Sequence, residues 1–364
     1  MNQNIKIPFV DLYPQYEELQ SEIDLAIRDI ITRSDYITGP TVEKFEQAII
    51  DYTGAEACAS IGSGTNALVC ALKALDIGPG HQVMTVGHTF VSTTEAIVNV
   101  GATPVFVDID EFYHLDVNKM ELTDTLKAIL FVDLYGQTPD IDKILSFAKQ
   151  FNLKVIEDAA QSFGSEYKGK QVGSVADLTC FSFNPVKNLG AMGDAGAVTG
   201  NKKLVEKVKM FRDHGRKTKF DYDVVGYNAR IDNLQAVIIK AKLKKIDSWL
   251  EKKRKICRKY TKELKDIVAC PKEAPWSKHS YYVYVIETPK GTRDKLQKFL
   301  KTKGIATNIH YKNPTHTTKA FADGTSLPRT EYVCDNILSL PCYHTLPEHH
   351  QNYIIKAVKE FYEN

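Results

Sequence analysis

Short, continuously apolar segments alternate with helical stretches through the first half of the sequence. The segments 82–86 (QVMTV), 103–109 (TPVFVDI), 128–134 (AILFVDL) and 153–158 (LKVIED) lack the polar alternation of a strand with one wet face. Stretches between them place apolar residues at helical spacing. Strands that are apolar on both faces need cover on both sides, so this pattern predicts an α/β fold with a largely parallel sheet between layers of helices.

The chain changes character after Asn201. Two lysine-rich stretches with helical periodicity follow, and the second, 233–265, is long enough to link two domains. Two strands and two helices are then predicted to form a compact α+β unit, with strands at 281–287 and 305–311 and helices at 293–304 and 349–364. We therefore predict a large domain at 1–245 and a small C-terminal domain at 246–364, with the N-terminal segment packing against the small domain.

The composition narrows the class of protein. The net charge is only +2, which argues against a nucleic-acid or membrane surface as the main partner. The lysines of 233–265 alternate with apolar residues at helical spacing, as on a solvated helix face.

Seven cysteines occur singly, without a C-x-x-C pair, so we predict neither a metal site nor a disulfide framework. The N-terminus lacks the pattern of a signal peptide and no apolar run approaches a membrane span, so we expect a cytoplasmic protein.

A glycine-rich turn, GSGT at 62–65, joins a predicted strand to a predicted helix. Small residues let backbone N–H groups approach an anion, and the positive end of the following helix points at the same place. A phosphate therefore fits here. An ordinary turn in which Ser or Thr caps the helix explains the same residues. Neither a P-loop nor G-x-G-x-x-G is present at this turn.

Asp158 closes the predicted strand at 153–158. In an open parallel sheet, the carboxyl ends of the strands line the ligand crevice. A carboxylate there can accept a hydrogen bond from a protonated heterocycle nitrogen and keep that nitrogen charged. A structural helix cap is the alternative interpretation.

Lys187 lies in TCFSFNPVKNLGAMGDAG, a stretch rich in small residues, with Phe181 and Phe183 before it and Pro185 close by. A lysine shielded from water has a lowered pKa, which makes its amine a nucleophile towards carbonyls near neutral pH. Ser182 can donate to an anion on the same side. A phosphate cradle, a carboxylate for a ring nitrogen and a reactive lysine are together what pyridoxal phosphate requires.

Several longer motifs resemble one family, the pyridoxal-phosphate-dependent nucleotide-sugar aminotransferases of the DegT/DnrJ/EryC1/StrS group. They run almost from end to end of the chain: PFVDL, ITGPTVEKFE, GSGTNAL, GATPVFVDID, LYGQ, VIEDAAQSFGSEYKGK, KNLGAMGDAG, HGR, GYNARIDNLQA, HYKNPTH and SLPCYHTLPE. The resemblance implies a type I aminotransferase fold, with a mostly parallel seven-stranded sheet in the large domain. It also implies a homodimer whose active sites are shared between subunits.

The resemblance assigns cofactor roles to residues of this chain. Lys187 matches the Schiff-base lysine, Asp158 the partner of the ring nitrogen and Gln161 the contact to the cofactor's hydroxyl. Phe90 matches the aromatic residue that stacks on the ring. The remaining matches contact the phosphate: Gly64, Thr65, Ser182 and Asn228. Of these, Asn228 reaches the phosphate from the neighbouring subunit.

Substrate positions follow from the same resemblance. His310 and Tyr311 match C-terminal residues that approach the sugar, and Tyr36 is a further candidate. Asn184 stands where relatives commonly carry an aromatic residue near the substrate, which marks a difference in this chain. Relatives with histidine at the lysine position are dehydratases, whereas Lys187 favours transamination.

LYGQ and the spacing of KNLGA to GDAG look most like enzymes acting at sugar carbon 3. The resemblance thus implies transfer of an amino group from L-glutamate to a dTDP-linked 3-keto-6-deoxyhexose, giving a dTDP-3-amino-3,6-dideoxyhexose for polysaccharide or lipopolysaccharide synthesis. One alternative is a C4 aminotransferase that acts on a UDP- or GDP-linked 4-keto-6-deoxy sugar. A second is a catalytically idle relative that binds the cofactor as a regulator or scaffold.

Overall fold

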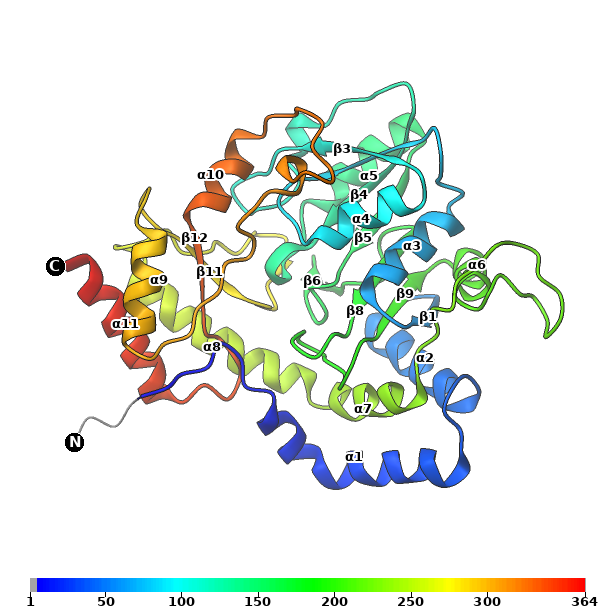
Figure 1. Cartoon of the computed structure of the whole chain (residues 1–364), viewed down its shortest axis with the longest axis horizontal. Coiled ribbons are helices and arrows are strands. Elements are labelled where there is room, and N and C mark those ends of the chain that lie inside the picture. Colours follow the sequence, from blue (N-terminus) through cyan, green and yellow to red (C-terminus); the bar gives the residue numbers. More distant parts are fainter. Residues whose placement is uncertain (1–4, 364) are drawn as a thin grey trace.

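The computed structural model describes residues 5–363. Residues 1–4 of the predicted large domain and Asn364 of the predicted last helix lie outside this range. The larger body of the molecule is built on a wide sheet, and a second body contains the C-terminal helix at its outer edge (Figure 1). Within residues 5–363, no helix has the length and apolar character needed to cross a membrane.

The central sheet has seven strands in the order β1-β9-β8-β5-β4-β2-β3. Its strands are β1 (Ala57–Ile61), β2 (Gln82–Val86), β3 (Thr103–Val107), β4 (Leu126–Val132), β5 (Lys154–Asp158), β8 (Leu178–Ser182) and β9 (Gly196–Gly200). β9 is antiparallel to β8 and β1, and the other neighbouring pairs are parallel. The predicted α/β fold with a largely parallel, seven-stranded sheet is confirmed.

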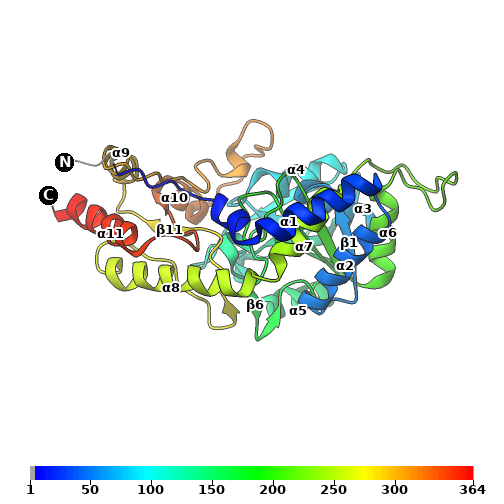
Figure 2. The same cartoon turned by 90° about the horizontal axis from the view of Figure 1, so that it is seen from below.

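Helices cover both faces of this sheet (Figure 2). They are α2 (Pro40–Thr53), α3 (Gly64–Ala74), α4 (Val91–Asn99), α5 (Ile141–Phe151), α6 (Lys202–Arg212) and α7 (Asn233–Leu243), and α1 (Tyr13–Arg33) packs on α7. α3 packs against α4 and α6, while α2 contacts α7. The side chains of β1 alternate between these layers: Ala59 joins the core of α3, and Cys58 packs with Phe45 of α2.

The second body has its own core. It contains α8 (Ile246–Leu264), α9 (Arg293–Thr302), α10 (Pro328–Asn336), α11 (Glu348–Glu363) and the antiparallel pair of β11 (Tyr284–Glu287) with β12 (Ile337–Leu340). Tyr260 of α8, Leu300 of α9 and Ile354 of α11 are fully buried there, and Ile7 from the N-terminal segment joins them. The division into a large domain at 1–245 and a small C-terminal domain at 246–364 stays a prediction.

The remaining elements are short. A small sheet joins β10 (Ser277–Lys278), β6 (Glu166–Tyr167) and β7 (Lys170–Gln171) beside the central sheet. Single 3-10 turns occur at η1 (Val117–Lys119), η2 (Leu134–Gly136) and η3 (Thr315–Thr317).

Three predicted elements differ from the structure. The predicted helix 233–265 is two helices, because α7 packs on α1 and α2 whereas α8 enters the second core. The predicted strand 281–287 is ordered as a strand only from Tyr284. The predicted strand 305–311 forms just isolated bridges at Ile305 and Asn308. Its final residues line a cavity instead of continuing a sheet.

Candidate active site

A cavity of about 620 Å³ opens at the carboxyl ends of the central strands. β5 ends there with Asp158, β8 with Ser182 and β4 with Val132, as the parallel topology requires. Ten of the predicted site residues line it: Gly64, Thr65, Phe90, Asp158, Gln161, Ser182, Asn184, Lys187, His310 and Tyr311. Residues far apart in the sequence therefore meet at one place.

The loop between β8 and β9 presents Lys187 to this cavity. The backbone N–H of Lys187 donates to the carbonyl of Asn184 (2.9 Å), and this hydrogen bond closes a turn in the loop. At Gly190 a Cβ would lie 2.3 Å from the carbonyl oxygen of Pro185, so only glycine allows this close approach. The turn therefore depends on the small residues that surround the lysine in the sequence.

The Lys187 amine lies 4.4 Å from the centre of the Tyr282 ring. Burial lowers the pKa of Lys187 to about 8, against the opposing effect of the Asp158 carboxylate. A lysine with this pKa has a substantial neutral fraction near pH 8. The neutral amine is a competent nucleophile towards a carbonyl, whereas an exposed lysine amine is mostly protonated at this pH.

Asp158 is almost fully buried, and both of its carboxylate oxygens accept hydrogen bonds. The Thr93 hydroxyl donates to Oδ2 (2.7 Å) and the Ala160 N–H donates to Oδ1 (3.2 Å). Burial raises the pKa of Asp158, while these two hydrogen bonds and Lys187 lower it. Each oxygen keeps capacity for another donor, which suits a cationic heterocycle N–H that faces the cavity. The alternative role as a helix cap is wrong, because a turn follows β5.

Small residues and hydroxyls from three elements form a cradle on one side of the cavity. Ser63 caps α3 by accepting from the N–H of Asn66 (3.2 Å), so the capping interpretation of GSGT is also correct. Gly64 approaches β8 so closely that a Cβ would lie 2.7 Å from Cβ of Ser182. The Thr65 and Ser92 hydroxyls are 2.8 Å apart. Hydroxyls beside a helix N-terminus suit a phosphate.

The amide of Gln161 has a defined orientation. Its Oε1 accepts from the backbone N–H of Tyr135 (2.8 Å), so Nε2 is the group that donates to the Tyr311 hydroxyl (3.0 Å). Gln161 therefore presents a donor beside Tyr311. A hydroxyl or phenolate oxygen of a ligand can accept from it.

The predicted sugar-side residues Asn184, His310 and Tyr311 also line the cavity. The Nδ2 group of Asn308 donates to Nε2 of His310 (3.3 Å), and Nδ1 of His310 lies 2.8 Å from the Ser339 hydroxyl. Burial and Lys187 lower the pKa of His310 to about 4, so this imidazole is neutral near pH 7. Asn184 donates to Asp194, which also lines the cavity (3.0 Å). These groups offer neutral hydrogen-bonding partners and one carboxylate.

Phe90 precedes α4 and is half exposed at the cavity, with its ring centre 5.7 Å from that of Tyr311. Tyr36 and Asn228 do not line the cavity of this single chain. Tyr36 is 46% exposed on the surface. Asn228 is also exposed, and its Oδ1 accepts from Arg230 (2.7 Å). The sugar contact of Tyr36 and the phosphate contact of Asn228 stay predictions. If Asn228 has that role, it must act at the site of another chain.

Thr93 and Tyr282 also line the cavity, and neither is among the residues predicted from the sequence. Phe90 directly precedes α4 and Thr93 lies on its first turn, so the closeness of Thr93 to a predicted site residue in the sequence was a usable signal. Tyr282 had no comparable local signal. It lies in a segment that was predicted to be strand, about a hundred residues from the lysine it contacts.

The residues of this cavity fit the predicted cofactor, pyridoxal phosphate. The cradle of Gly64, Thr65 and Ser182 brings α3 close to β8 only because position 64 lacks a Cβ. Asp158 is a buried carboxylate with hydrogen-bonding capacity left, and Lys187 is an amine of lowered pKa. These three features would hold the phosphate, the ring nitrogen and the aldehyde carbon of one molecule.

Comparison with known proteins agrees with this chemistry. A model of the DegT/DnrJ/EryC1/StrS aminotransferase family matches residues 17–359. The chain is 40% identical to a pleiotropic regulatory protein of Geobacillus stearothermophilus, over 99% of this chain and 100% of that protein. It is 38% identical to a UDP-N-acetyl-3-dehydro-α-D-glucosamine 3-aminotransferase of Acidithiobacillus ferrooxidans, over 96% of each.

A third relative is a dTDP-3-amino-3,4,6-trideoxy-α-D-glucose transaminase of Streptomyces venezuelae. It is 35% identical over 98% of this chain and 97% of that protein. Among solved structures, that of DesV of S. venezuelae in complex with a ketimine intermediate superposes with a TM-score of 0.95. It is 35% identical and the match covers 99% of both chains.

Proposed function

The chain belongs to the DegT/DnrJ/EryC1/StrS aminotransferase family and is a pyridoxal-phosphate-dependent enzyme that acts on nucleotide-linked sugars, and we propose that it aminates carbon 3 of a dTDP-linked 3-keto-6-deoxyhexose. The amino donor is L-glutamate and the product a dTDP-3-amino-3,6-dideoxyhexose. The enzyme works in the cytoplasm and supplies an amino sugar for a polysaccharide or lipopolysaccharide.

One observation carries the chemical part of this proposal. Lys187, Asp158 and the cradle at Gly64 and Ser182 line the same cavity at the carboxyl end of the sheet. Each feature alone has a structural explanation. Together they match the amine, the acid and the anion site that amino transfer requires.

Bound pyridoxal phosphate supplies an aldehyde and a protonated ring that accepts electrons. The Lys187 amine would hold the aldehyde carbon of the bound cofactor. When not bonded, this amine would act as the base that moves a proton at the donor's α-carbon, which needs the neutral form that burial favours. Asp158 keeps the ring nitrogen protonated, and the hydrogen bond from Thr93 keeps Asp158 ionised.

The remaining residues hold and orient ligands. Gln161, whose Nε2 donates to Tyr311, has a second N–H that would donate to the ring hydroxyl of the cofactor, and Phe90 would pack on its ring. Gly64, Thr65 and Ser182 would hold the phosphate, together with Asn228 of a second subunit. The sugar contacts Asn184, His310, Tyr311 and Tyr36. Neutral His310 suits the uncharged hydroxyl and keto groups of a deoxysugar, because it can accept or donate a hydrogen bond without a charge.

The choice of substrate follows from the relatives together with this cavity. The transaminase of S. venezuelae is named for a 3-amino dTDP-sugar, and the A. ferrooxidans relative for a UDP-sugar aminated at carbon 3. Both names place the amino group at carbon 3, which favours the same carbon here over carbon 4. The regulatory name of the G. stearothermophilus relative does not favour an idle protein, since the lysine and its acid partner are in place in this chain.

A panel of keto sugars tests the proposal. Purified protein is incubated with L-glutamate and, separately, dTDP- or UDP-linked 3-keto sugars and UDP- or GDP-linked 4-keto sugars. Mass spectrometry measures the product and NMR locates the nitrogen. We expect turnover of the dTDP-linked 3-keto-6-deoxyhexose well above that of the others. Preferred amination at carbon 4 would replace the proposal with the C4 alternative. The Lys187→Ala variant is the control for non-enzymatic amination.

A further inference from the structure

The side chain next to the reactive lysine ties its turn to another part of the chain. Asn188 is 8% exposed, and both ends of its amide have partners. Nδ2 lies 3.0 Å from the Ser280 hydroxyl, and Oδ1 accepts from the ammonium of Lys253 (2.8 Å). An ammonium only donates, so this contact fixes the orientation of the amide. Asn188 thus bridges α8 and the segment that precedes β11.

Lys253 contacts both Asn188 and the residue whose ring lies against the Lys187 amine. Its ammonium also donates to the backbone carbonyl of Tyr282 (3.2 Å). Tyr282 is the residue whose ring centre lies 4.4 Å from Nζ of Lys187. The turn that carries Lys187 and the ring that contacts its amine therefore share one anchor, the pair formed by Asn188 and Lys253.

The segment on the far side of this anchor is itself held in place. The N–H of Ser280 donates to the carbonyl of Gly136 (2.7 Å), and its hydroxyl lies 2.9 Å from that of Ser165. At Gly136, φ is +105° and a Cβ would lie 2.5 Å from the Ser280 hydroxyl, so a side chain there would displace Ser280. Ser280 is therefore a fixed point for Asn188 to contact.

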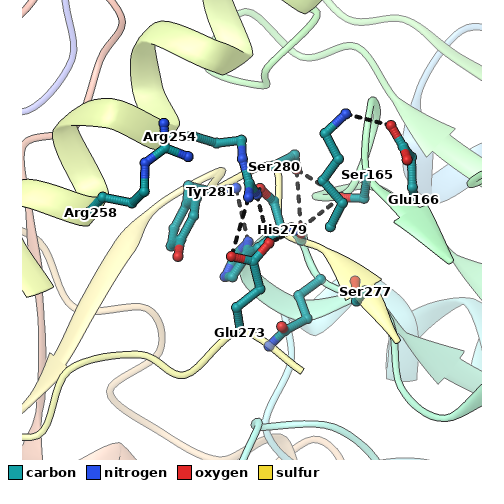
Figure 3. A network of polar contacts seen from close by, with 12 residues as sticks. Ser165, Glu166, Arg254, Arg258, Glu273, Ser277, His279, Ser280 and Tyr281 are labelled. Carbon is teal, nitrogen blue, oxygen red and sulfur yellow. Dashed lines mark hydrogen bonds and ion pairs between the residues drawn. The ribbon is translucent and has the colours of Figure 1, made fainter. Parts of the chain in front are cut away.

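Arg254 of α8 holds the same segment through further contacts. Figure 3 shows Arg254 directed at Glu273, and His279 beside Tyr281. Arg254 donates to Glu273 (2.7 Å) and to the carbonyl of His279 (2.5 Å). Glu273 accepts in turn from the N–H of His279 (2.9 Å), and the rings of His279 and Tyr281 stack 3.9 Å apart. The segment from His279 to Tyr282 has little freedom to move relative to α8.

We propose that Asn188 is a positioning residue, which holds the Lys187 amine against the Tyr282 ring by bridging Lys253 and Ser280. A lysine stem has four rotatable bonds, so the amine is placed by its turn and by what surrounds its end. Proton movement at a defined atom depends steeply on that placement. This inference rests on the proposed role of Lys187.

The test measures covalent attachment of pyridoxal phosphate to full-length protein freed of cofactor. The attachment rate is followed by absorbance across pH, the adduct is reduced with borohydride, and peptide mapping locates it. We expect Asn188→Ala to slow attachment at saturating cofactor by about ten- to a hundredfold and to move the pH midpoint of the rate. Asn188→Asp should recover only part of the rate, because its carboxylate can accept from Lys253, whereas the Ser280 hydroxyl donates its one proton to the Gly136 carbonyl (3.2 Å).

Asn336→Ala is the matched control. Asn336 is also buried, and its side chain donates to the carbonyl of Tyr332 (2.7 Å), away from the cavity. It should lose stability without losing attachment rate. Lys253→Met should slow attachment like Asn188→Ala, and the double variant should be no slower than the worse single one.

Two results would overturn the inference, and only the second would also contradict the proposed role of Lys187. An Asn188→Ala variant that attaches cofactor at Lys187 with the wild-type rate and pH midpoint contradicts the positioning role alone. Wild-type protein that forms its adduct at a lysine other than Lys187 contradicts both this inference and the proposed role of Lys187.

Discussion

The Thr93 hydroxyl donates a hydrogen bond to Oδ2 of the buried Asp158 carboxylate, at 2.7 Å. The Thr89 hydroxyl lies 2.8 Å from that of Thr93. Because Thr93 uses its only proton on Asp158, Thr89 must be the donor in the second contact. Two threonines of one segment thus stabilise the ionised acid that burial alone would tend to neutralise.

Thr93→Val should reveal this contact. Valine keeps the shape of the side chain but removes the donor, so the pKa of Asp158 rises and the ring nitrogen loses part of its support. A hydrogen bond to a charged group contributes about 1.5–3 kcal/mol, which predicts a loss of about ten- to a hundredfold. The measurement is the single-turnover rate of 2-oxoglutarate formation from L-glutamate.

Thr94→Val is the control for that experiment. Thr94 is the next residue of α4, equally buried, and its hydroxyl contacts Thr315 (3.2 Å) and not the acid. Its rate should stay near that of wild type. Equal losses in the two variants would mean that packing of α4, and not the bond to Asp158, sets the rate.

The lowered pKa of Lys187 predicts how cofactor uptake depends on pH. The rate of covalent attachment should rise as the pH increases through about 8 and level off above it, instead of rising up to the ordinary lysine value of 10.5. The Lys187→Ala variant should bind the cofactor without a covalent bond. A midpoint near 10.5 would show that the amine is solvated in the cofactor-free protein.

The same shift affects stability. Between about pH 8 and 10.5, the unfolded chain binds a proton at this lysine that the folded chain does not. Lys187 should therefore contribute a rise in the free energy of unfolding of the cofactor-free protein across this window, so the slope of that free energy against pH should be more positive in wild type than in Lys187→Met. Chemical denaturation at a series of pH values measures both curves.

The sequence predicts the parts of the site that follow from topology. Gly64, Asp158 and Ser182 lie at the ends of strands or the starts of helices, and a parallel sheet brings those ends together whatever the details of packing. Tyr282 could not be predicted in this way. Its contact with Lys187 depends on how the segment before β11 packs on α8, which no local pattern encodes.

A buried carboxyl pair below the cavity predicts a second pH effect. Asp133 and Glu157 are fully buried, and burial raises both pKa values, that of Glu157 to about 7. Between its ordinary value of 4.5 and about 7, the folded protein binds more protons than the unfolded chain. The pair should therefore contribute a fall in the free energy of unfolding as the pH rises through this window.

Glu157→Gln should flatten that dependence, because it removes one ionisable member of the pair while its amide oxygen still accepts from Thr179, which donates to Glu157 at 2.6 Å. Denaturation between pH 5 and 8 measures the effect. Glu121→Gln, at an exposed position, should leave the wild-type dependence intact. Parallel curves for wild type and Glu157→Gln would show that the pair carries no charge change in this range.

The predicted role of Asn228 requires a second subunit, because this residue is exposed and does not line the cavity of its own chain. Lys187→Ala and Asn228→Ala should each be impaired, the second through weaker binding of the cofactor phosphate. When the two variants are unfolded and refolded together, half of the dimers are hybrids, and each hybrid has one intact site. Activity should therefore return to about a quarter of the wild-type level.

The two variants refolded separately and then mixed provide the baseline. If refolding together restores nothing beyond that baseline, Lys187 and Asn228 do not serve the same site from different subunits.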